Sequence, residues 1–230
     1  MKIIEFLNHN FIADFLSENS IIIDLGGNRG EFTKFIFENF NSNIYVVEPI
    51  LELYNQIFDN LKIKKFNYCI SNYKKVEISI PKNQCATVYD KNFENKIICK
   101  GITLEELIKQ NNISKVDLLK VDIEGAEIEM FETIPHDILK NINQITVEFH
   151  DFLWPELKLK IKKIKKMIEN NGFYCIKFSI KNNGDILFIK KDLISKIEYF
   201  YLKYFYRYIV GIKRVLNRLF ENIRLWKIKN

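Results

Sequence analysis

A short run of glycines follows the first apolar stretch of the chain. Residues 24–30 read Asp-Leu-Gly-Gly-Asn-Arg-Gly, directly after the β-branched residues 21–23. Glycines in a strand-to-helix turn let the backbone approach a ligand closely. Glu48 lies 18 residues after Gly30, where a carboxylate can accept hydrogen bonds from both ribose hydroxyls of a nucleoside. Together the two features predict a site for a nucleoside cofactor.

The spacing of the glycines separates the candidate cofactors. Dinucleotide sites use G-x-G-x-x-G, but this chain has Asn28 and Glu31 at the second and third glycine positions. It also has no G-K-[ST] phosphate loop. The arrangement D-x-G-x-x-x-G suits S-adenosylmethionine, which presents an amino acid, a sulfonium and a ribose. We therefore predict S-adenosylmethionine as the cofactor.

A second group of polar residues follows two later apolar runs. Asp122 and Glu124 come directly after residues 116–121, and Glu148 and His150 alternate to one side at the end of the next run. In open α/β sheets ligands bind outside the carboxyl ends of the strands. We therefore expect these four side chains to face the same crevice as the glycine turn.

The chain resembles the FkbM-type methyltransferase family over about residues 20–152. Four segments carry the resemblance: IDLGGNRG at 23–30, VEP at 47–49, LKVDIEGAE at 119–127 and VEFH at 147–150. The third segment is the most specific of these. The resemblance implies an enzyme that uses S-adenosylmethionine to methylate hydroxyls of sugars or polyketides.

The resemblance also implies a fold and a set of contacts. The fold is the Rossmann-like, seven-strand class I methyltransferase fold, α/β with a mostly parallel sheet and a C-terminal antiparallel hairpin. The glycine turn would hold the methionine moiety, Glu48 the ribose, and Ser71 with Asn72 the adenine. The predicted cofactor-binding residues are Asp24, Gly26, Gly27, Asn28, Gly30, Glu48, Ser71 and Asp122.

Methyl transfer to a hydroxyl needs a base or a metal to help remove the proton. His150 is the first candidate for the base because its ordinary pKa is closest to neutrality. Asp122 is the second candidate and Glu148 the third. A divalent cation held by Asp122, Glu124 and Glu148 is an alternative that we do not favour. The structural alternative is that the histidine only packs and the acids only cap a helix.

Missing motifs narrow the choice of acceptor atom. The chain lacks the [DN]-P-P-[YF] motif of amino-methylases of DNA bases, and no proline precedes a cysteine as in cytosine-carbon methylases. With the resemblance, this indicates an O-methyltransferase for a sugar or glycan hydroxyl, including a lipid-linked glycan. A polyketide-type acceptor stays open. A catalytically silent methyltransferase-like scaffold or binding module also stays open.

The elements that position these residues alternate between strand and helix, as in βαβ units. Strands are expected at 21–25, 44–48, 116–121 and 145–149, helices at 31–40, 51–61, 124–131 and 157–170, and an antiparallel hairpin at 173–180 and 185–190. Short strands are expected at 76–81 and 86–89. This order predicts a sheet with helices on both faces.

Charge divides the chain into two parts. The 230 residues carry a net charge of +6. The last forty residues, 191–230, hold ten basic and three acidic residues, which is a net charge of +7. Residues 1–190 are therefore close to neutral and form the predicted methyltransferase domain. Residues 191–230 form a predicted amphipathic helical tail, with seven aromatic residues within 199–208. We expect this tail to contact a membrane surface, the protein body or a second copy, and nucleic acid is not favoured as a partner.

Cysteine usage and the N-terminus bear on the compartment. The four cysteines show no C-x-x-C spacing, which favours reduced, buried thiols. Lys2 and Glu5 interrupt any apolar run of a signal peptide. We therefore expect a cytoplasmic protein, either free or peripheral on the cytoplasmic face of a membrane.

Overall fold

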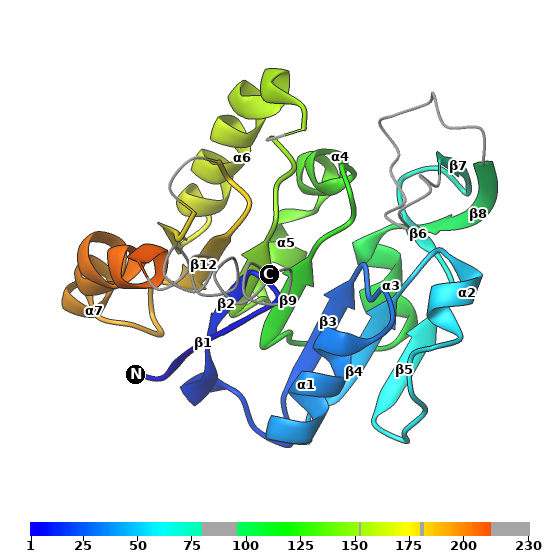
Figure 1. Ribbon diagram of the computed structural model, residues 1–230, viewed down its shortest axis with the longest axis horizontal. Coiled ribbons are helices and arrows are strands. Elements are labelled where there is room, and N and C mark those ends of the chain that lie inside the picture. Colours follow the sequence, from blue (N-terminus) through cyan, green and yellow to red (C-terminus); the bar gives the residue numbers. More distant parts are fainter. Residues whose placement is uncertain (80–95, 152, 180–181, 213–230) are drawn as a thin grey trace, which may run out of the picture.

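A seven-stranded sheet forms the centre of the protein (Figure 1). The computed structural model describes residues 1–79, 96–151, 153–179 and 182–212. The strand order is β11-β12-β10-β9-β3-β4-β5, and all neighbours pair in parallel except at β12, which is antiparallel to both β10 and β11. The strands are β3 (Ile21–Leu25), β4 (Asn43–Val47), β5 (Ile63–Phe66), β9 (Leu118–Val121), β10 (Gln144–Val147), β11 (Phe173–Lys177) and β12 (Ile186–Lys190). The predicted α/β class and C-terminal antiparallel hairpin are confirmed.

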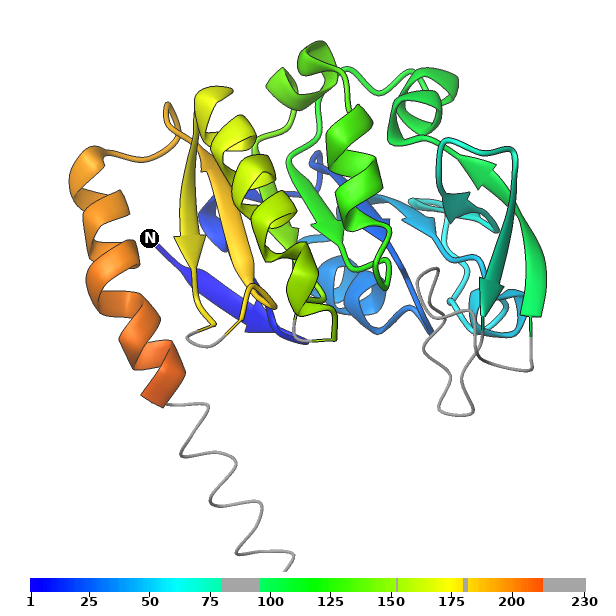
Figure 2. The same cartoon turned by 90° about the horizontal axis from the view of Figure 1, so that it is seen from above.

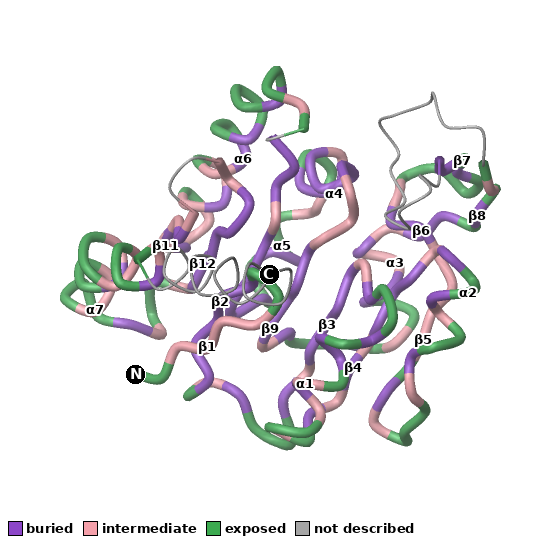
Figure 3. The backbone as a smooth tube through the Cα atoms, viewed as in Figure 1, coloured by how far each residue is buried: buried purple, intermediate pink, exposed green. Residues whose placement is uncertain are grey.

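Helices cover both faces of this sheet (Figure 2). They are α1 (Glu31–Phe40), α3 (Leu104–Gln110), α4 (Glu127–Thr133), α5 (His136–Lys140) and α6 (Lys158–Asn170). The short helix α2 (Leu51–Tyr54) packs instead through Leu53 against a separate apolar cluster that contains Cys69 and Ile78. Alternation along β3 assigns its side chains to the two faces. Ile22 packs with Phe32 and Ile36 of α1, whereas Ile23 packs with the apolar residues of α3 to α6. The central strands are accordingly buried along their length (Figure 3).

Helix α2 is much shorter than the predicted helix over residues 51–61 and ends at Tyr54. The chain then turns so that Ile57 packs beneath Gly30, where an added Cβ would lie 3.1 Å from the Ile57 side chain. The Lys65 ammonium donates to the Ile57 carbonyl at 2.9 Å, while Leu61 is fully exposed. The helix-like spacing of apolar residues in 51–61 arises because Ile57 is buried by the turn after Tyr54. The prediction of a helix over residues 51–61 was therefore wrong beyond Tyr54.

The predicted helix over 124–131 begins later, at Glu127. Residues 122–126 form a loop because the Glu127 carboxylate accepts hydrogen bonds from the backbone N–H groups of Ile123 and Gly125. The expected strand at 76–81 corresponds to β7 (Lys75–Ser79), which pairs with β8 (Lys96–Ile102) beside β6 (Cys69–Ile70). The expected strand at 86–89 lies outside the described residues.

An N-terminal hairpin, which the sequence patterns did not indicate, packs against the sheet. It consists of β1 (Ile3–Phe6) and β2 (His9–Ile12). The Gln144 side chain joins it to β10, because its oxygen accepts from the Ile12 N–H at 2.8 Å and its amide donates to the Ile12 carbonyl at 3.1 Å. Asn10 also donates to Asp185 at 2.7 Å. These contacts bring His9 to the carboxyl end of β10, close to the predicted site.

The described part of the C-terminal tail is a helix that packs on the sheet. It begins at Ser195, whose side chain caps α7 (Lys196–Tyr201), and continues through a π-helical turn, Leu202–Tyr206, to residue 212. Leu202 and Val210 are buried in an apolar cluster with residues of β11 and β12. The outer face exposes the aromatic residues Phe200, Tyr201, Tyr204, Phe205 and Tyr208. Residues 213–230 of the predicted tail lie outside the described residues.

The cysteines and the helices of the described residues bear on the expected thiols and on membrane crossing. Cys69, Cys99 and Cys175 are free and buried, as expected, whereas Cys85 lies outside the described residues. Among the described helices, none combines the length and the apolar character that crossing a bilayer requires.

The packing of the tail generates a stability prediction. Leu202→Ala should lower the free energy of unfolding by about 2–4 kcal/mol, because Leu202 is fully buried and the substitution leaves a cavity. Phe205→Ala is the matched control, since Phe205 is 57% exposed on the same helix. Urea unfolding followed by circular dichroism measures both variants. Equal effects of the two substitutions would show that the helix does not pack in this way.

Candidate functional site

The glycine turn between β3 and α1 lies against the carboxyl ends of two other strands. The N–H groups of Gly26 and Gly27 both donate to the Val47 carbonyl at 3.0 Å. Gly26 has φ +79°, and a Cβ there would lie 1.8 Å from the backbone oxygen of Asp122. No other residue can occupy this position without moving the backbone. The turn therefore brings β3, β4 and β9 together at one edge of the sheet.

Glu48 follows β4 and lies beside this turn. Its carboxylate accepts from the Asn28 N–H at 2.8 Å and from the Ile50 N–H at 2.9 Å, one bond on each oxygen. Each oxygen keeps a further lone pair that can accept from a ligand hydroxyl. Burial raises the pKa of Glu48 to about 7, and the two backbone N–H groups only partly oppose this rise. The placement fits the predicted contact with a ribose.

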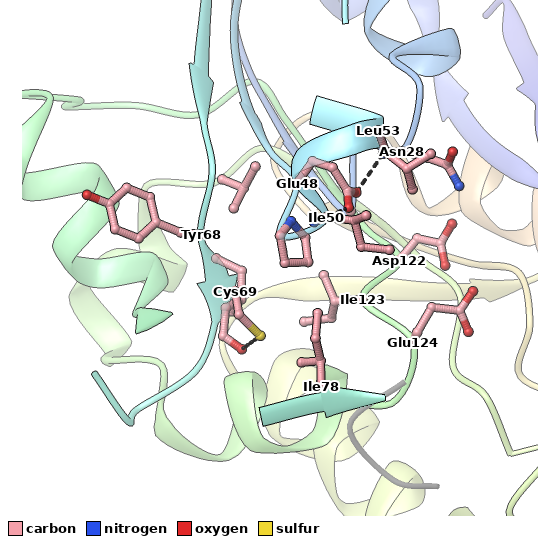
Figure 4. A pocket seen from close by; sticks show the side chains of 14 residues that line it. Asn28, Glu48, Ile50, Leu53, Tyr68, Cys69, Ile78, Asp122, Ile123 and Glu124 are labelled. Carbon is pink, nitrogen blue, oxygen red and sulfur yellow. Dashed lines mark hydrogen bonds between the residues drawn. The ribbon is translucent and has the colours of Figure 1, made fainter. Parts of the chain in front are cut away.

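A cavity opens between the glycine turn and β6 (Figure 4). The cavity and the open space at its mouth together measure about 620 Å³. Apolar surface comes from Ile50, Leu53 and Ile78. The polar part of the cavity holds the carboxylates of Glu48, Asp122 and Glu124. The remaining lining residues are Gly26, Asn28, Val47, Pro49, Tyr68, Cys69, Ile70 and Ile123. An apolar slot next to a carboxylate matches an adenine joined to a ribose. The cavity residues therefore fit an adenosyl cofactor.

Lys120 lies in the interior of β9, directly beneath the glycine turn, and sequence reasoning missed it. Its ammonium donates to the carbonyls of Leu25 at 3.3 Å and Gly26 at 2.6 Å. It is also 3.2 Å from Asp24 and 3.6 Å from Asp122. Burial alone would lower the pKa of Lys120, but the two carboxylates outweigh it and raise the pKa above its usual range. The sequence does contain a signal for Lys120, because a lysine within an apolar strand is buried and a buried ammonium requires an acidic partner.

Asp24 is completely buried under the turn and does not line the cavity. Its carboxylate accepts from the Thr33 hydroxyl at 2.7 Å and pairs with Lys120. The structure therefore gives this predicted cofactor-binding residue a supporting position. Gly27 and Gly30 likewise belong to the turn but do not line the cavity, whereas Gly26 and Asn28 do.

His150 follows β10 and is surrounded by carboxylates. Its Nδ1 lies 3.1 Å from Glu127, and its Nε2 lies 3.2 Å from Glu124 and 3.7 Å from Asp122. Burial alone would lower the pKa of His150, but the carboxylates outweigh it and raise the pKa to about 9. The imidazole is therefore protonated at neutral pH before a substrate binds. The role of His150 as a base stays a prediction, and this charge weighs against it.

The other two catalytic candidates differ in protonation. Burial alone would raise the pKa of Asp122, but Lys120 and His150 hold it well below its usual range. Burial, followed by the nearby negative charge of Asp122, raises the pKa of Glu148 to about 7. Asp122, Glu124 and His150 thus meet at one place as predicted, with Glu148 within reach of Asp122.

Ser71 lies away from this group. Its hydroxyl donates to Glu129 at 3.3 Å, and the Asn72 backbone and side-chain N–H groups donate to the same carboxylate. Both residues line a second, smaller cavity between β6, α3 and α4. Their predicted contact with adenine stays a prediction.

His9 is the second residue that sequence reasoning missed. It is 1% exposed, its Nδ1 lies 3.2 Å from the Thr146 hydroxyl, and its Nε2 lies 3.7 Å from Asp122. Burial lowers the pKa of His9, so the ring is neutral at pH 7. No spacing in the sequence connects His9 to Asp122, because only the folding of the N-terminal hairpin onto β10 brings them together.

The strand order and the cavity at the carboxyl ends of the strands define a class I S-adenosylmethionine-dependent methyltransferase fold. The FkbM methyltransferase domain matches residues 24–175. The chain belongs to the FkbM methyltransferase family.

Comparisons with individual proteins agree with this assignment. Hexuronic acid methyltransferase AglP of Haloferax volcanii is 23% identical over 157 residues, which are 65% of this chain and 64% of that protein. Methyltransferase 1 of Beauveria bassiana is 22% identical over 186 residues, 68% of this chain and 73% of that protein. A solved structure of a candidate rRNA methylase from Clostridium thermocellum, 11% identical, covers 78% of this chain and 90% of that one with a TM-score of 0.50. That last likeness shows the fold alone.

The environment of Glu48 generates a pH prediction. Below about pH 7 the carboxyl of Glu48 becomes protonated and loses part of its capacity to accept from ribose hydroxyls. The affinity for S-adenosylmethionine should therefore fall as the pH is lowered from 8 to 6. Glu48→Gln should bind about tenfold more weakly at pH 8, a loss of about 1.4 kcal/mol. Isothermal titration calorimetry across this pH range measures both proteins.

The Glu48→Gln variant also serves as the control for other groups that titrate. Its affinity should change much less between pH 6 and pH 8 than that of the wild type. Parallel pH curves for the two proteins would show that Glu48 is not the titrating group.

Proposed function

We propose that the protein transfers the methyl group of S-adenosylmethionine to a hydroxyl oxygen of a sugar or glycan. One observation carries the proposal: a cavity lined by apolar side chains and by Glu48 opens directly beside a cluster of ionisable side chains at the same edge of the sheet. Membership of the FkbM methyltransferase family supports methyl transfer as the reaction. The likeness to a protein named hexuronic acid methyltransferase supports a sugar as the acceptor.

The residues divide into a donor side and an acceptor side. On the donor side, Glu48 would bind the ribose, and Gly26 and Asn28 would lie along the methionine moiety. The cofactor supplies the methyl group on a sulfonium, so the protein contributes mainly by holding donor and acceptor in line. The glycine turn is suited to this because Lys120 and Gly26 fix its position relative to β9.

On the acceptor side, Asp122 and Glu124 border the cavity and His150 lies behind them. Their hydrogen-bonding groups would orient the acceptor hydroxyl toward the methyl carbon. Asp122, Glu148 and His150 remain the candidates for removing the hydroxyl proton. Glu127 holds the 122–126 loop and the imidazole of His150, so its role is to position other groups.

The proposed reaction can be tested with a panel of acceptors. The protein is incubated with S-adenosylmethionine labelled with a CD3 methyl group and with hexuronic acid glycosides, neutral hexose glycosides or lipid-linked glycans. We expect a mass increase of one labelled methyl on a sugar acceptor, and we expect the Glu48→Gln variant to be slowed at least tenfold at a subsaturating cofactor concentration. Mild alkaline treatment cleaves a methyl ester formed on a carboxylate but leaves a methyl ether formed on a hydroxyl intact. Mass spectrometry after this treatment therefore distinguishes the two products.

Other results would redirect the assignment. An alkali-labile product would identify a carboxylate as the acceptor and contradict O-methylation of a hydroxyl. Transfer only to polyketide-type alcohols would replace the sugar acceptor. Tight cofactor binding without transfer to any hydroxyl would favour the scaffold or binding-module alternative.

We also propose that the tail helix brings the protein to an anionic membrane surface, where a lipid-linked glycan would be found. Its outer face exposes Phe200 and Phe205, and the half-buried Lys203 and Arg207 lie on the same helix, nearer to β11. A helix that combines aromatic and basic residues favours binding to anionic interfaces. Residues 213–230 add further basic and apolar residues in sequence.

The double substitution Phe200→Ser with Phe205→Ser should reduce binding to phosphatidylglycerol vesicles by roughly tenfold, because two inserted aromatic rings are lost. Leu159→Ser on α6 is the matched control, since Leu159 is 74% exposed on another surface. Vesicle sedimentation measures binding, and light scattering measures whether the substitutions change the oligomeric state. Unchanged vesicle binding with loss of a dimer would instead identify the helix as an interface between copies.

A further inference from the structure

His9 has a ring nitrogen without a hydrogen bond in the interior of the protein. Its side chain is 1% exposed, and its Nε2 has no hydrogen-bond partner. The ring is held in place by the Thr146 hydroxyl, 3.2 Å from Nδ1, and by the edge of Phe32, with 5.8 Å between ring centroids. When Nδ1–H donates to Thr146, Nε2 presents a lone pair toward Asp122. A buried nitrogen in this state is suited to bind a cation.

Two carboxylates meet this nitrogen from neighbouring strands. Asp122 follows β9 and Glu148 follows β10, and one ligand atom from each residue lies within 4.8 Å of the other and of the His9 nitrogen. Three such donors around one point can bind a single ion after small side-chain rotations. Neither carboxylate comes from the element that carries His9, so the arrangement depends on the N-terminal hairpin packing on the sheet.

The charge around this point favours a further cation. Asp122, Glu124, Glu127 and Glu148 lie within one cluster, and Lys120 and His150 are its positive members. Lys120 also pairs with Asp24 and with two backbone carbonyls, so its charge is shared with groups below the cluster. The cluster therefore retains an excess of negative charge on the side that faces the cavity.

We propose that His9, Asp122 and Glu148 bind a divalent first-row metal ion beside the cofactor cavity. One imidazole nitrogen and two carboxylates suit Mn²⁺ or Zn²⁺ better than the all-oxygen preference of Mg²⁺ or Ca²⁺. Asp122 also lines the cavity, so the ion would lie next to the space that an acceptor oxygen would occupy. The proposal goes beyond the methyltransferase function, because the ion can bind in the absence of both substrates.

A neighbouring group offers the main alternative within the same cluster. Asp122, Glu124 and His150 also bring three ligand atoms within 4.8 Å of one another. In that group, however, the His150 Nε2 already lies 3.2 Å from Glu124. His9 Nε2 has no such close partner, and this difference places the ion on the His9 side of Asp122.

The test measures Mn²⁺ binding by the full chain without cofactor, after removal of metals with a chelator. Titration calorimetry and the electron paramagnetic resonance signal of free Mn²⁺ give the stoichiometry and affinity. We expect one site in the wild type and at least a tenfold loss of affinity in His9→Gln. His136→Gln is the matched control, because His136 is exposed on α5 and distant from the cluster. Circular dichroism confirms that each variant is folded.

Two further variants keep the test decisive. If His9→Gln fails to fold, Glu148→Gln should show the same loss, because it removes a ligand charge while keeping the shape of the side chain. Loss of the site in His150→Gln, with retention in His9→Gln, would overturn the proposal in favour of the neighbouring group. Absence of Mn²⁺ binding to the wild type at millimolar concentration would also overturn it.

Binding of S-adenosylmethionine to the same metal-free protein separates this proposal from the proposed function. Retained cofactor binding without a metal site would overturn the metal site alone. A metal site without cofactor binding would overturn the methyltransferase function alone.

Discussion

The buried ammonium of Lys120 is the interaction on which the rest of the site depends. It stands inside β9, yet it contacts the carbonyls of Leu25 and Gly26, the buried carboxylate of Asp24 and the partly exposed carboxylate of Asp122. A buried charge is tolerated only when it is paired and hydrogen-bonded. All four partners belong to the glycine turn, to β3 or to the loop after β9. This requirement therefore sets where the glycine turn lies relative to Asp122.

Mutual electrostatic influence then sets the protonation states around the cavity. Asp122 stays ionised because cationic groups surround it, and its charge in turn helps to raise the pKa of Glu148 and of His150. Glu48 belongs to a different environment, in which burial dominates and two backbone N–H groups only moderate the effect. Acidic residues with similar ordinary pKa values therefore differ in charge at neutral pH. Such separation of protonation states is common where catalysis or ligand binding needs both a charged and a neutral group.

The N-terminal hairpin brings a buried histidine to the carboxylates of Asp122 and Glu148. Gln144 pairs with the backbone of Ile12, and this fixes β2 against β10. As a result, His9 reaches Asp122 from outside the alternating strand–helix part of the fold. The family domain matches from residue 24 onward, so this contribution comes from a segment outside the matched range.

The sequence by itself determined the order of the main strands, the glycine turn, the acidic end of β4 and the cofactor class, because these depend on local spacing and on the carboxyl ends of neighbouring parallel strands. It also indicated that Asp122, Glu124 and His150 meet. It misjudged α2, because the burial of Ile57 under Gly30 produces helix-like spacing in a turn. Only the tertiary structure decided the place of His9, the position of Asp24 beneath the turn and the protonated state of His150. The reason is physical: pKa values and long-range contacts depend on burial and on charges that arrive from distant parts of the chain.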